Sequence, residues 1–293
     1  MKLEKLSMRK KRNKKREKTE LTIESIGFNG IAVARREDLV YFVKGAVPGD
    51  KVIAEIRRKK KKHIEAEVDE ILEHSIDRVL PLCKYFGTCG GCTWQHLRYE
   101  EQLEWKRRHV KDAFERIGKI KPEEILRSIP SPQIFNYRNK MDFSFGASRW
   151  LTKEEIQNKE NISQKHFALG LHIPGRYDKI LDIDSCQIQM EEGNEILNLF
   201  REKALESGVT PFHEKTHEGF LRNLVLRTSP VEKEMMCILV TNTPSTKEDE
   251  DFLEWYRNEF PKLFPMAVSI IHAVNPEIKP VAIGEINFVQ GRD

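Results

Sequence analysis

Four of the five cysteines in this 293-residue sequence are candidates for binding a metal. Three of them, Cys83, Cys89 and Cys92, lie within ten residues, and Gly90-Gly91 between the last two permits a tight bend. Three thiolates in such a loop can converge on one soft metal centre. A centre of this kind needs a fourth ligand.

The sequence offers two candidates for that fourth ligand. His96 follows Cys92 closely, and three cysteines with one histidine form a structural zinc site. Cys186 lies far downstream in LDIDSCQIQ, and four thiolates suit a 4Fe-4S cluster. The spacing alone leaves both sets open. The fifth cysteine, Cys237, lies in the apolar stretch MMCILV, which predicts a buried and unreactive structural thiol.

Positive charge is concentrated in two parts of the chain. Residues 1–18 contain ten Lys or Arg and two Glu, although the net charge of the whole chain is only +4. The second run is RRKKKK, which comprises Arg57, Arg58, Lys59, Lys60, Lys61 and Lys62. Such runs bind phosphate backbones because each neutralised phosphate releases counterions, and the alternative for each run is a solvated surface.

Composition points to a globular protein of two or three domains, with 39% hydrophobic and 33% charged residues. No stretch has the roughly 18 to 20 apolar residues of a membrane span, and the N-terminus lacks the apolar segment of a signal peptide. We therefore expect a cytoplasmic protein without a membrane partner. In that compartment clustered cysteines bind metal more often than they form disulfides.

The fold class that we expect is α+β and multidomain, beginning with a disordered basic tail over residues 1–20. Residues 21–78 read as short strands separated by turns, which predicts a small closed β-barrel of the OB type, a common platform for nucleic acid. Phe28 lies in one of these turns and can fill the barrel or stack on a base. We expect it in the core.

The metal-binding loop, residues 79–96, follows the barrel. A helical segment over 97–129 comes next, with a helix at 97–117 that stops at Gly118. Residues 130–293 alternate strand patterns with helix candidates near 191–207 and 247–260, which predicts a central α+β domain with a mainly antiparallel sheet.

The cysteine loop also resembles a known signature. The run C-x5-C-G-G-C-x2-Q-H-L-x-Y-x2-Q-L, from Cys83 to Leu103, resembles the iron-sulfur signature of the RNA (uracil-5-)-methyltransferases, in particular the 23S rRNA type with a TRAM domain. That family takes its fourth thiolate from a downstream cysteine in a context like Asp184-Ser185-Cys186. The resemblance therefore implies Cys186 as the fourth ligand and a packing role for His96.

The resemblance continues on both sides of the loop. Residues 27–34 and 42–50 are similar to the TRAM domain, a small RNA-binding barrel. Residues 137–140 and 221–227 look like the central domain of the family. The resemblance to this family implies that the partner is RNA, 23S rRNA in particular, and that the protein is a monomer. The expected RNA contacts are Arg57 to Lys62 with Arg138, Arg222 and Arg227, although each of these three arginines can instead pair with an intramolecular carboxylate.

The family's chemistry requires more than these residues. A cysteine thiolate adds at C6 of uracil, C5 takes the methyl group of S-adenosylmethionine, and a base removes the C5 proton. The resemblance assigns these groups to a Rossmann-like domain. Because no Gly-rich loop follows a strand here, we expect that domain to be missing and the catalytic groups and the S-adenosylmethionine site to lie beyond Asp293. No catalytic residue is predicted within the chain.

Two rival functions remain to be compared. The radical methylthiotransferases also combine TRAM modules with iron-sulfur clusters, but they use C-x3-C-x2-C and carry TRAM at the other end of the chain. Neither feature matches. The stronger alternative is a non-catalytic RNA-binding protein with a structural iron-sulfur or zinc site.

Overall fold

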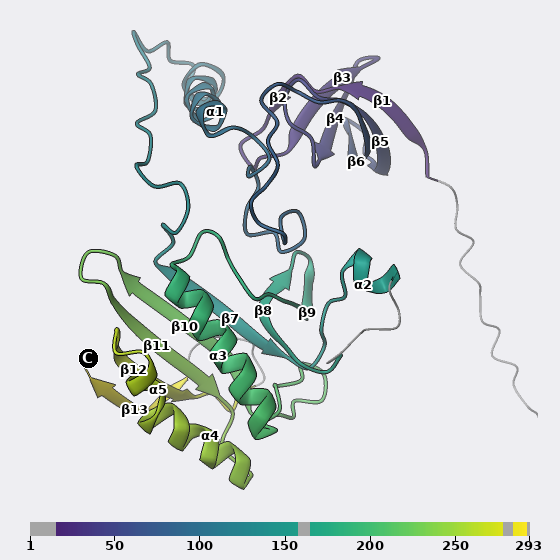
Figure 1. The fold of residues 1–293 in the computed structure, drawn as a ribbon. Helices are drawn as coiled ribbons and strands as arrows, with labels where there is room; N and C mark the ends of the chain where they lie inside the picture. The colour runs from purple at the N-terminus through teal and green to yellow at the C-terminus, as the bar shows by residue number, and fades with distance from the viewer. Residues whose placement is uncertain (1–15, 158–164, 278–283, 292–293) are drawn as a thin grey trace, which may run out of the picture. The chain divides into compact units, whose positions relative to one another are not determined.

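The computed structural model describes residues 16–157, 165–277 and 284–291. The chain forms two compact units (Figure 1). The first unit combines the residues up to Pro81 with Thr93–Pro130, and the second combines Leu82–Cys92 with the residues from Ser131 onward. The three clustered cysteines therefore belong to the same unit as Cys186.

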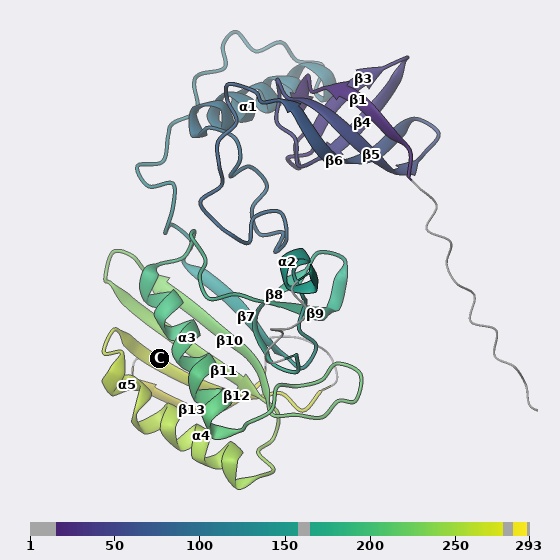
Figure 2. The same cartoon turned by 45° about the vertical axis from the view of Figure 1, so that its right-hand side comes forward.

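A six-stranded sheet forms most of the first unit and curls around its own core (Figure 2). All neighbouring strands are antiparallel except the parallel pair β4 and β6. The sheet order is β1-β5-β6-β4-β3-β2, with β1 (Lys18–Thr22), β2 (Ser25–Ile26), β3 (Ala32–Arg36), β4 (Leu39–Lys44), β5 (Lys51–Lys59) and β6 (His63–Glu73).

Alternation of buried and exposed residues explains these strands. In β5, Val52, Ala54 and Ile56 point into the core, whereas the residues between them are half-buried. The strands lie where the sequence predicts the barrel, except that β1 begins at Lys18, within the tail expected to be disordered; residues 1–15 of that tail lie outside the described residues. Phe28 is an exception to the predicted core, since its side chain is 66% exposed in the turn between β2 and β3.

The helix α1 (Tyr99–Asp112) packs against this sheet, and a π-helical turn (Ala113–Ile117) continues it to Gly118, as the sequence predicts. Leu97 and Trp105 form a small buried cluster with Ile26 and Val47. The imidazole Nε2 of His109 lies 2.7 Å from the carbonyl oxygen of Ile26. The helical segment is therefore part of the barrel unit and not a separate segment after the cysteine loop.

The second unit is built on a seven-stranded sheet in which only β11 and β12 are parallel. The sheet order is β13-β12-β11-β10-β7-β8-β9, with β7 (Lys140–Gly146), β8 (Ala168–Ile173), β9 (Arg176–Asp182), β10 (Leu221–Ser229), β11 (Glu234–Thr241), β12 (Ala267–Val274) and β13 (Glu285–Gly291). The helices of this unit are α2 (Lys153–Gln157), α3 (Glu191–Ser207), α4 (Lys247–Asn258) and α5 (Phe260–Leu263).

The helices α3 and α4 cover one face of this sheet, as both ribbon views show (Figures 1 and 2). Phe200 of α3 is fully buried and contacts Phe252, Tyr256 and Phe260 with ring centroids 5.1 to 6.3 Å apart. Apolar residues recur along α3 at helical spacing, which explains why this face of the helix is buried against the sheet.

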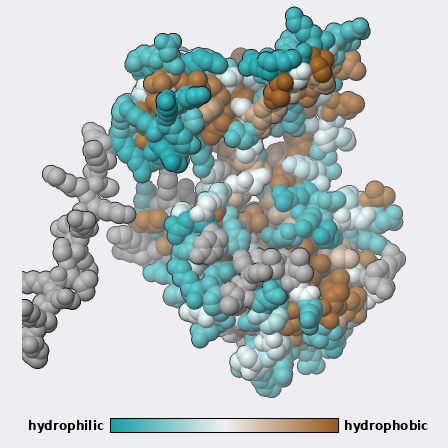
Figure 3. Space-filling view, turned by 180° about the vertical axis from the view of Figure 1, so that it is seen from behind, coloured by the Kyte–Doolittle hydropathy of each residue, from teal (hydrophilic) through white to brown (hydrophobic). Residues whose placement is uncertain are grey.

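Hydrophilic residues cover much of the face shown in Figure 3, with hydrophobic patches between them. Within the three described ranges, no helix is both long and apolar enough to cross a membrane.

Candidate functional site

The cysteine loop folds into a tight structure of its own. The amide of Phe86 donates to the carbonyl oxygen of Cys83 at 3.0 Å, and the amide of Cys89 donates to that of Tyr85 at 3.2 Å. Gly90 has a positive φ of 74°, and a Cβ atom there would lie 2.2 Å from Cγ of Pro174. Only glycine therefore allows the loop to approach the turn between β8 and β9 this closely.

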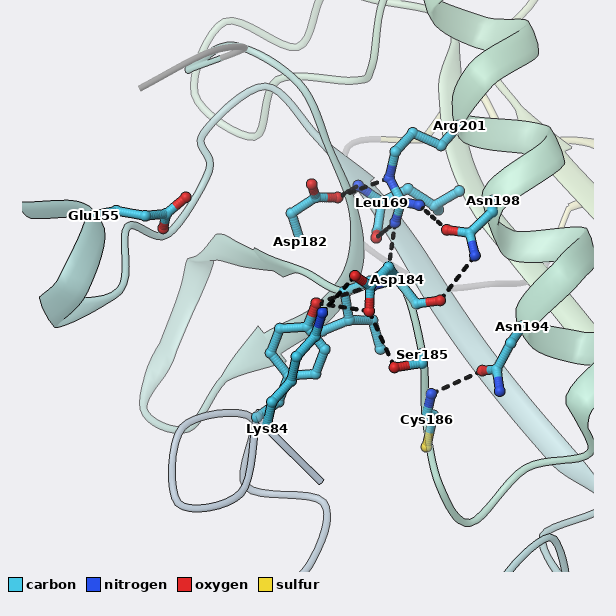
Figure 4. A network of polar contacts seen from close by, with 12 residues as sticks. Lys84, Glu155, Leu169, Asp182, Asp184, Ser185, Cys186, Asn194, Asn198 and Arg201 are labelled. Carbon is cyan, nitrogen blue, oxygen red and sulfur yellow. Dashed lines mark hydrogen bonds and ion pairs between the residues drawn. The ribbon is translucent and has the colours of Figure 1, made fainter. Parts of the chain in front are cut away.

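Asp184 attaches this loop to the segment that carries Cys186 (Figure 4). The ammonium of Lys84 lies 2.5 Å from one oxygen of Asp184, and the Tyr85 hydroxyl donates to the other at 3.1 Å. Burial opposes ionisation of Asp184, but its hydrogen bonds with Lys84, Ser185 and Tyr85 and the charge of Lys84 lower its pKa. The carboxylate therefore stays charged and keeps the two segments together.

Polar residues along α3 fix the other side of that segment. Asn194 accepts the amide of Cys186 at 2.7 Å, and Asn198 donates to the carbonyl oxygen of Asp184 at 2.9 Å. One turn further on, Arg201 pairs with Asp182 at 3.2 Å (Figure 4). These three residues lie at i, i+4 and i+7, so one face of the helix presents all of them to the segment.

Three of the four candidate ligands, Cys83, Cys89 and Cys186, are close enough for the charge of one thiol to affect the pKa of another. Burial raises the pKa of the Cys83 thiol, and the charges of Cys89 and Cys186 raise it further. The pKa of Cys89 is raised in the same way, chiefly by burial and then by Cys186. The pKa of the Tyr137 hydroxyl is raised chiefly by burial and further by the charges of Cys92 and Cys186.

All five cysteines are free thiols in the structure. The described part of the chain contains no group of three or more His, Cys, Asp or Glu residues arranged around a single metal ion. His96 is buried in the first unit, where burial, and then the charge of Arg78, lowers its pKa to about 4. This burial agrees with a packing role, and the absence of His96 from the ligand set stays a prediction.

Cys237 is the buried thiol that the sequence predicts. It is completely buried in β11, and burial raises its pKa to about 12. The hydroxyl of Tyr256 donates to its carbonyl oxygen at 2.8 Å. A thiol with such a pKa is not a nucleophile near neutral pH.

The basic run lies at the β5–β6 hairpin and is partly neutralised. Arg57 pairs with Glu55 at 2.6 Å and with Glu67 at 2.8 Å, and Lys59 pairs with Glu17 at 2.7 Å. Lys60 pairs with Glu65. Arg58, Lys61 and Lys62 are exposed, and within the described ranges no carboxylate lies at ion-pair distance from them.

The three other predicted RNA contacts differ in exposure. Arg227 is exposed on β10, opposite Lys140 of β7. Arg138 is also exposed, and its charge lowers the pKa of the Cys89 thiol, although burial raises that pKa by more. Arg222 is only 4% exposed, and its guanidinium donates to the carbonyl oxygens of Asn275 and Glu277 at 3.0 and 2.7 Å. Arg222 is therefore not placed to contact RNA.

The sequence did not reveal a hollow of about 340 Å³ next to the Lys84 and Asp184 contact. Its cations and carboxylates are matched with one another. The three ion pairs are Lys84 with Asp184, Arg149 with Glu155 and Arg201 with Asp182. The sequence pointed to this hollow only indirectly: Lys84 follows Cys83 directly, and Asp184 lies two residues before Cys186.

Comparisons with known proteins agree on one group of enzymes. The chain is 37% identical over 247 residues to an uncharacterized RNA methyltransferase of Chlorobaculum tepidum, which covers 84% of this chain and 50% of that protein. It is 38% identical over 267 residues to one of Bacteroides thetaiotaomicron, which covers 90% of this chain and 58% of that protein. No family model matches.

A solved structure supports the same relationship. The tRNA (uracil-54, C5)-methyltransferase of Pyrococcus abyssi, solved with S-adenosyl-L-homocysteine, matches with a TM-score of 0.60 and 26% identity. The match covers 93% of this chain and 55% of that one. The chain thus spans between half and three fifths of the proteins that it matches.

These matches correct our expectation about the fold class. The sequence leads us to expect an α+β protein from which a methyltransferase domain is missing, and this expectation is wrong because 93% of the chain aligns with a solved methyltransferase. By sequence and by fold, this chain is similar to RNA methyltransferases over half to three fifths of their length.

Proposed function

We propose that this protein takes part in the methylation of uridine at C5 in RNA, with S-adenosylmethionine as the methyl donor. The observation that carries this proposal is the match of 93% of the chain to a uracil C5 tRNA methyltransferase. We further propose 23S rRNA as the substrate, because the barrel of the first unit resembles the TRAM domain of the 23S rRNA type. A cytoplasmic location and a monomeric state stay predictions.

We infer that Cys83, Cys89, Cys92 and Cys186 hold a 4Fe-4S cluster. Two observations support this set. The Lys84 and Asp184 pair holds the loop of the first three cysteines beside the Cys186 segment, and the charge of Cys186 raises the pKa of both Cys83 and Cys89.

The bound cluster would supply iron–thiolate bonds that tie the loop to the segment before α3. Methyl transfer from S-adenosylmethionine requires no electron, so this role is structural. The residues of the chain supply the rest of the arrangement: Asn194 orients the backbone at Cys186, and Asp184 binds the Lys84 side chain. Arg138 places a positive charge near the Cys89 thiol.

The metal content of the chain, purified without oxygen, tests the cluster. About four irons and four sulfides with absorption near ~400 nm are expected. Cys186→Ser should lose most of the iron, whereas Cys237→Ala, at a cysteine outside the set, should retain it. One zinc per chain without colour, or full iron in Cys186→Ser, would contradict the proposed ligand set.

Nucleoside analysis tests the substrate. Deletion of the gene should remove a 5-methyluridine from 23S rRNA and leave the tRNA level unchanged, and re-expression should restore it. Loss from tRNA alone would support uracil methylation but reject 23S rRNA as the substrate. An unchanged 5-methyluridine content in both RNAs would reject the proposed reaction.

A further inference from the structure

Phe28 is an exposed aromatic residue at a fixed position on the first unit. Its turn is closed by the amide of Gly30, which donates to the carbonyl oxygen of Gly27 at 2.8 Å, and by the amide of Gly27, which donates to that of Ile31 at 2.8 Å. Gly30 has a φ of 77°, and a Cβ atom there would lie 2.3 Å from Nε1 of Trp94. The turn is therefore pressed against the indole and is not free to swing.

The Phe28 ring is supported from one side only. Its centroid lies 4.6 Å from that of the His109 imidazole, with an angle of 31° between the planes. His109 is 8% exposed, and its Nε2 donates to the carbonyl oxygen of Ile26 at 2.7 Å, which fixes the imidazole plane. The indoles of Trp94 and Trp105 lie beside this imidazole, at 5.8 and 6.3 Å. Two thirds of the Phe28 side chain nevertheless remains open to solvent.

The surroundings of Phe28 suit a nucleic acid better than a protein. Among the described residues of the six strands and their turns, the other exposed large apolar residues are Leu39 and Leu72, at 37% and 42%. On α1 and the turn that continues it, Val110, Phe114 and Ile117 are also exposed, at 46%, 43% and 76%, so the choice of a nucleic acid rests on positive charge. Positive side chains lie on the neighbouring helix: exposed Lys106 is one turn before His109, and the Arg108 guanidinium lies 4.6 Å from the Trp105 ring.

We propose that Phe28 is a stacking platform for one base of single-stranded RNA, with Lys106 placed to attract the adjoining phosphate. The inference rests on the RNA-binding function proposed above and adds a specific contact residue to it. Base stacking on a ring that is already held in place costs little ordering entropy, and every base has a face that can occupy it.

Fluorescence anisotropy with a labelled oligouridylate of about ten nucleotides tests the proposal on the full chain. Phe28→Leu keeps an apolar side chain but removes the aromatic face, and should weaken binding by about fivefold or more. Phe28→Tyr should bind within about twofold of the unmodified chain. Leu72→Ala, an exposed apolar control on β6, should also have little effect. Because Phe28 is exposed, all three variants should keep the parent melting temperature.

The outcomes separate this inference from the function on which it rests. Equal affinities for the parent and Phe28→Leu, with binding still weakened by salt, would overturn the stacking platform alone. Absence of any binding by the parent chain would overturn both the platform and the proposed RNA-binding function. If Phe28→Leu changes the sedimentation of the chain and leaves RNA affinity intact, Phe28 contacts protein, and the proposal is wrong.

Discussion

At the scale of single residues, the buried carboxylate of Asp50 connects three segments of the first unit. It accepts the amides of Val47 and Ser75 at 2.8 and 3.0 Å, and it pairs with the guanidinium of Arg78 at 2.6 Å. Removing one partner of such a buried pair leaves the other charge without compensation. We expect Asp50→Asn to lower the free energy of unfolding by about 3 kcal/mol in urea titrations. Glu24→Gln, which removes an exposed pair with Arg35, should cost less than about 1 kcal/mol.

The ionisation of Asp50 also gives stability a pH dependence. Burial alone would raise its pKa, but the hydrogen bonds from Arg78, Ser75 and Val47 and the charge of Arg78 together lower it below the ordinary value of 3.8. Since the unfolded state then binds the proton more tightly, this contribution is complete above pH 3.8 and is lost as the pH falls through the lower folded pKa. The free energy of unfolding of Asp50→Asn should therefore decrease less steeply than that of the parent as the pH is lowered. The same decrease of the free energy of unfolding with falling pH in both proteins would show that Asp50 does not contribute to the pH dependence of stability.

Substitution of two glycines in the cysteine loop can distinguish the effect of backbone strain on iron binding from the effect of a steric clash. Gly87 and Gly90 both have positive φ, at 80° and 74°, but a Cβ atom meets Pro174 only at position 90 and has open space at position 87. Gly87→Ala should cost about 1 kcal/mol of conformational strain and retain the iron. Gly90→Ala should displace the loop and lower the iron content per chain. Equal iron in both variants would refute the need for the close approach to Pro174.

At the scale of elements, α1 is held to the barrel by a few side chains. Trp105 is 9% exposed and packs with Leu97, Val47 and Ile26. Trp105→Ala should reduce the free energy of unfolding by about 3 kcal/mol, because it leaves a cavity under the helix, and should expose the 93–130 segment to protease. Val110→Ala on the same helix, at a residue 46% exposed, is the matched control. Unchanged protease resistance in Trp105→Ala would show that α1 is held by other contacts.

At the scale of the whole molecule, charge decides how RNA binding responds to salt. The chain has a net charge of +4, but several cations of the Arg57 to Lys62 run are already paired with carboxylates. We expect replacement of Arg58, Lys61 and Lys62 by glutamine to reduce the slope of log affinity against log salt by about 2 for single-stranded RNA. Lys59→Gln, which removes a cation paired with Glu17, should change the slope by much less. An equal change of the salt slope for each cation replaced in the two variants would show that cations paired with carboxylates contact RNA as readily as unpaired ones.

The sequence by itself determined the features that depend on neighbouring residues. Alternation gave the strands of the barrel unit, and helical spacing gave α1, α3 and α4 with the stop at Gly118. The apolar stretch around Cys237 gave its burial. In each case the signal is contained within a few residues, because backbone periodicity and local polarity decide the outcome.

Only the tertiary structure decided the features that require distant segments to meet. The sequence predicts Arg222 as an RNA contact or the partner of a carboxylate, yet its guanidinium is buried and donates to the carbonyl oxygens of Asn275 and Glu277. Phe28 resembles a core residue, yet its turn is pressed against Trp94 and the ring remains at the surface. Lys84 reaches Asp184 across a hundred residues of chain. Burial and pairing depend on which segments pack together, and one-dimensional spacing does not contain that information.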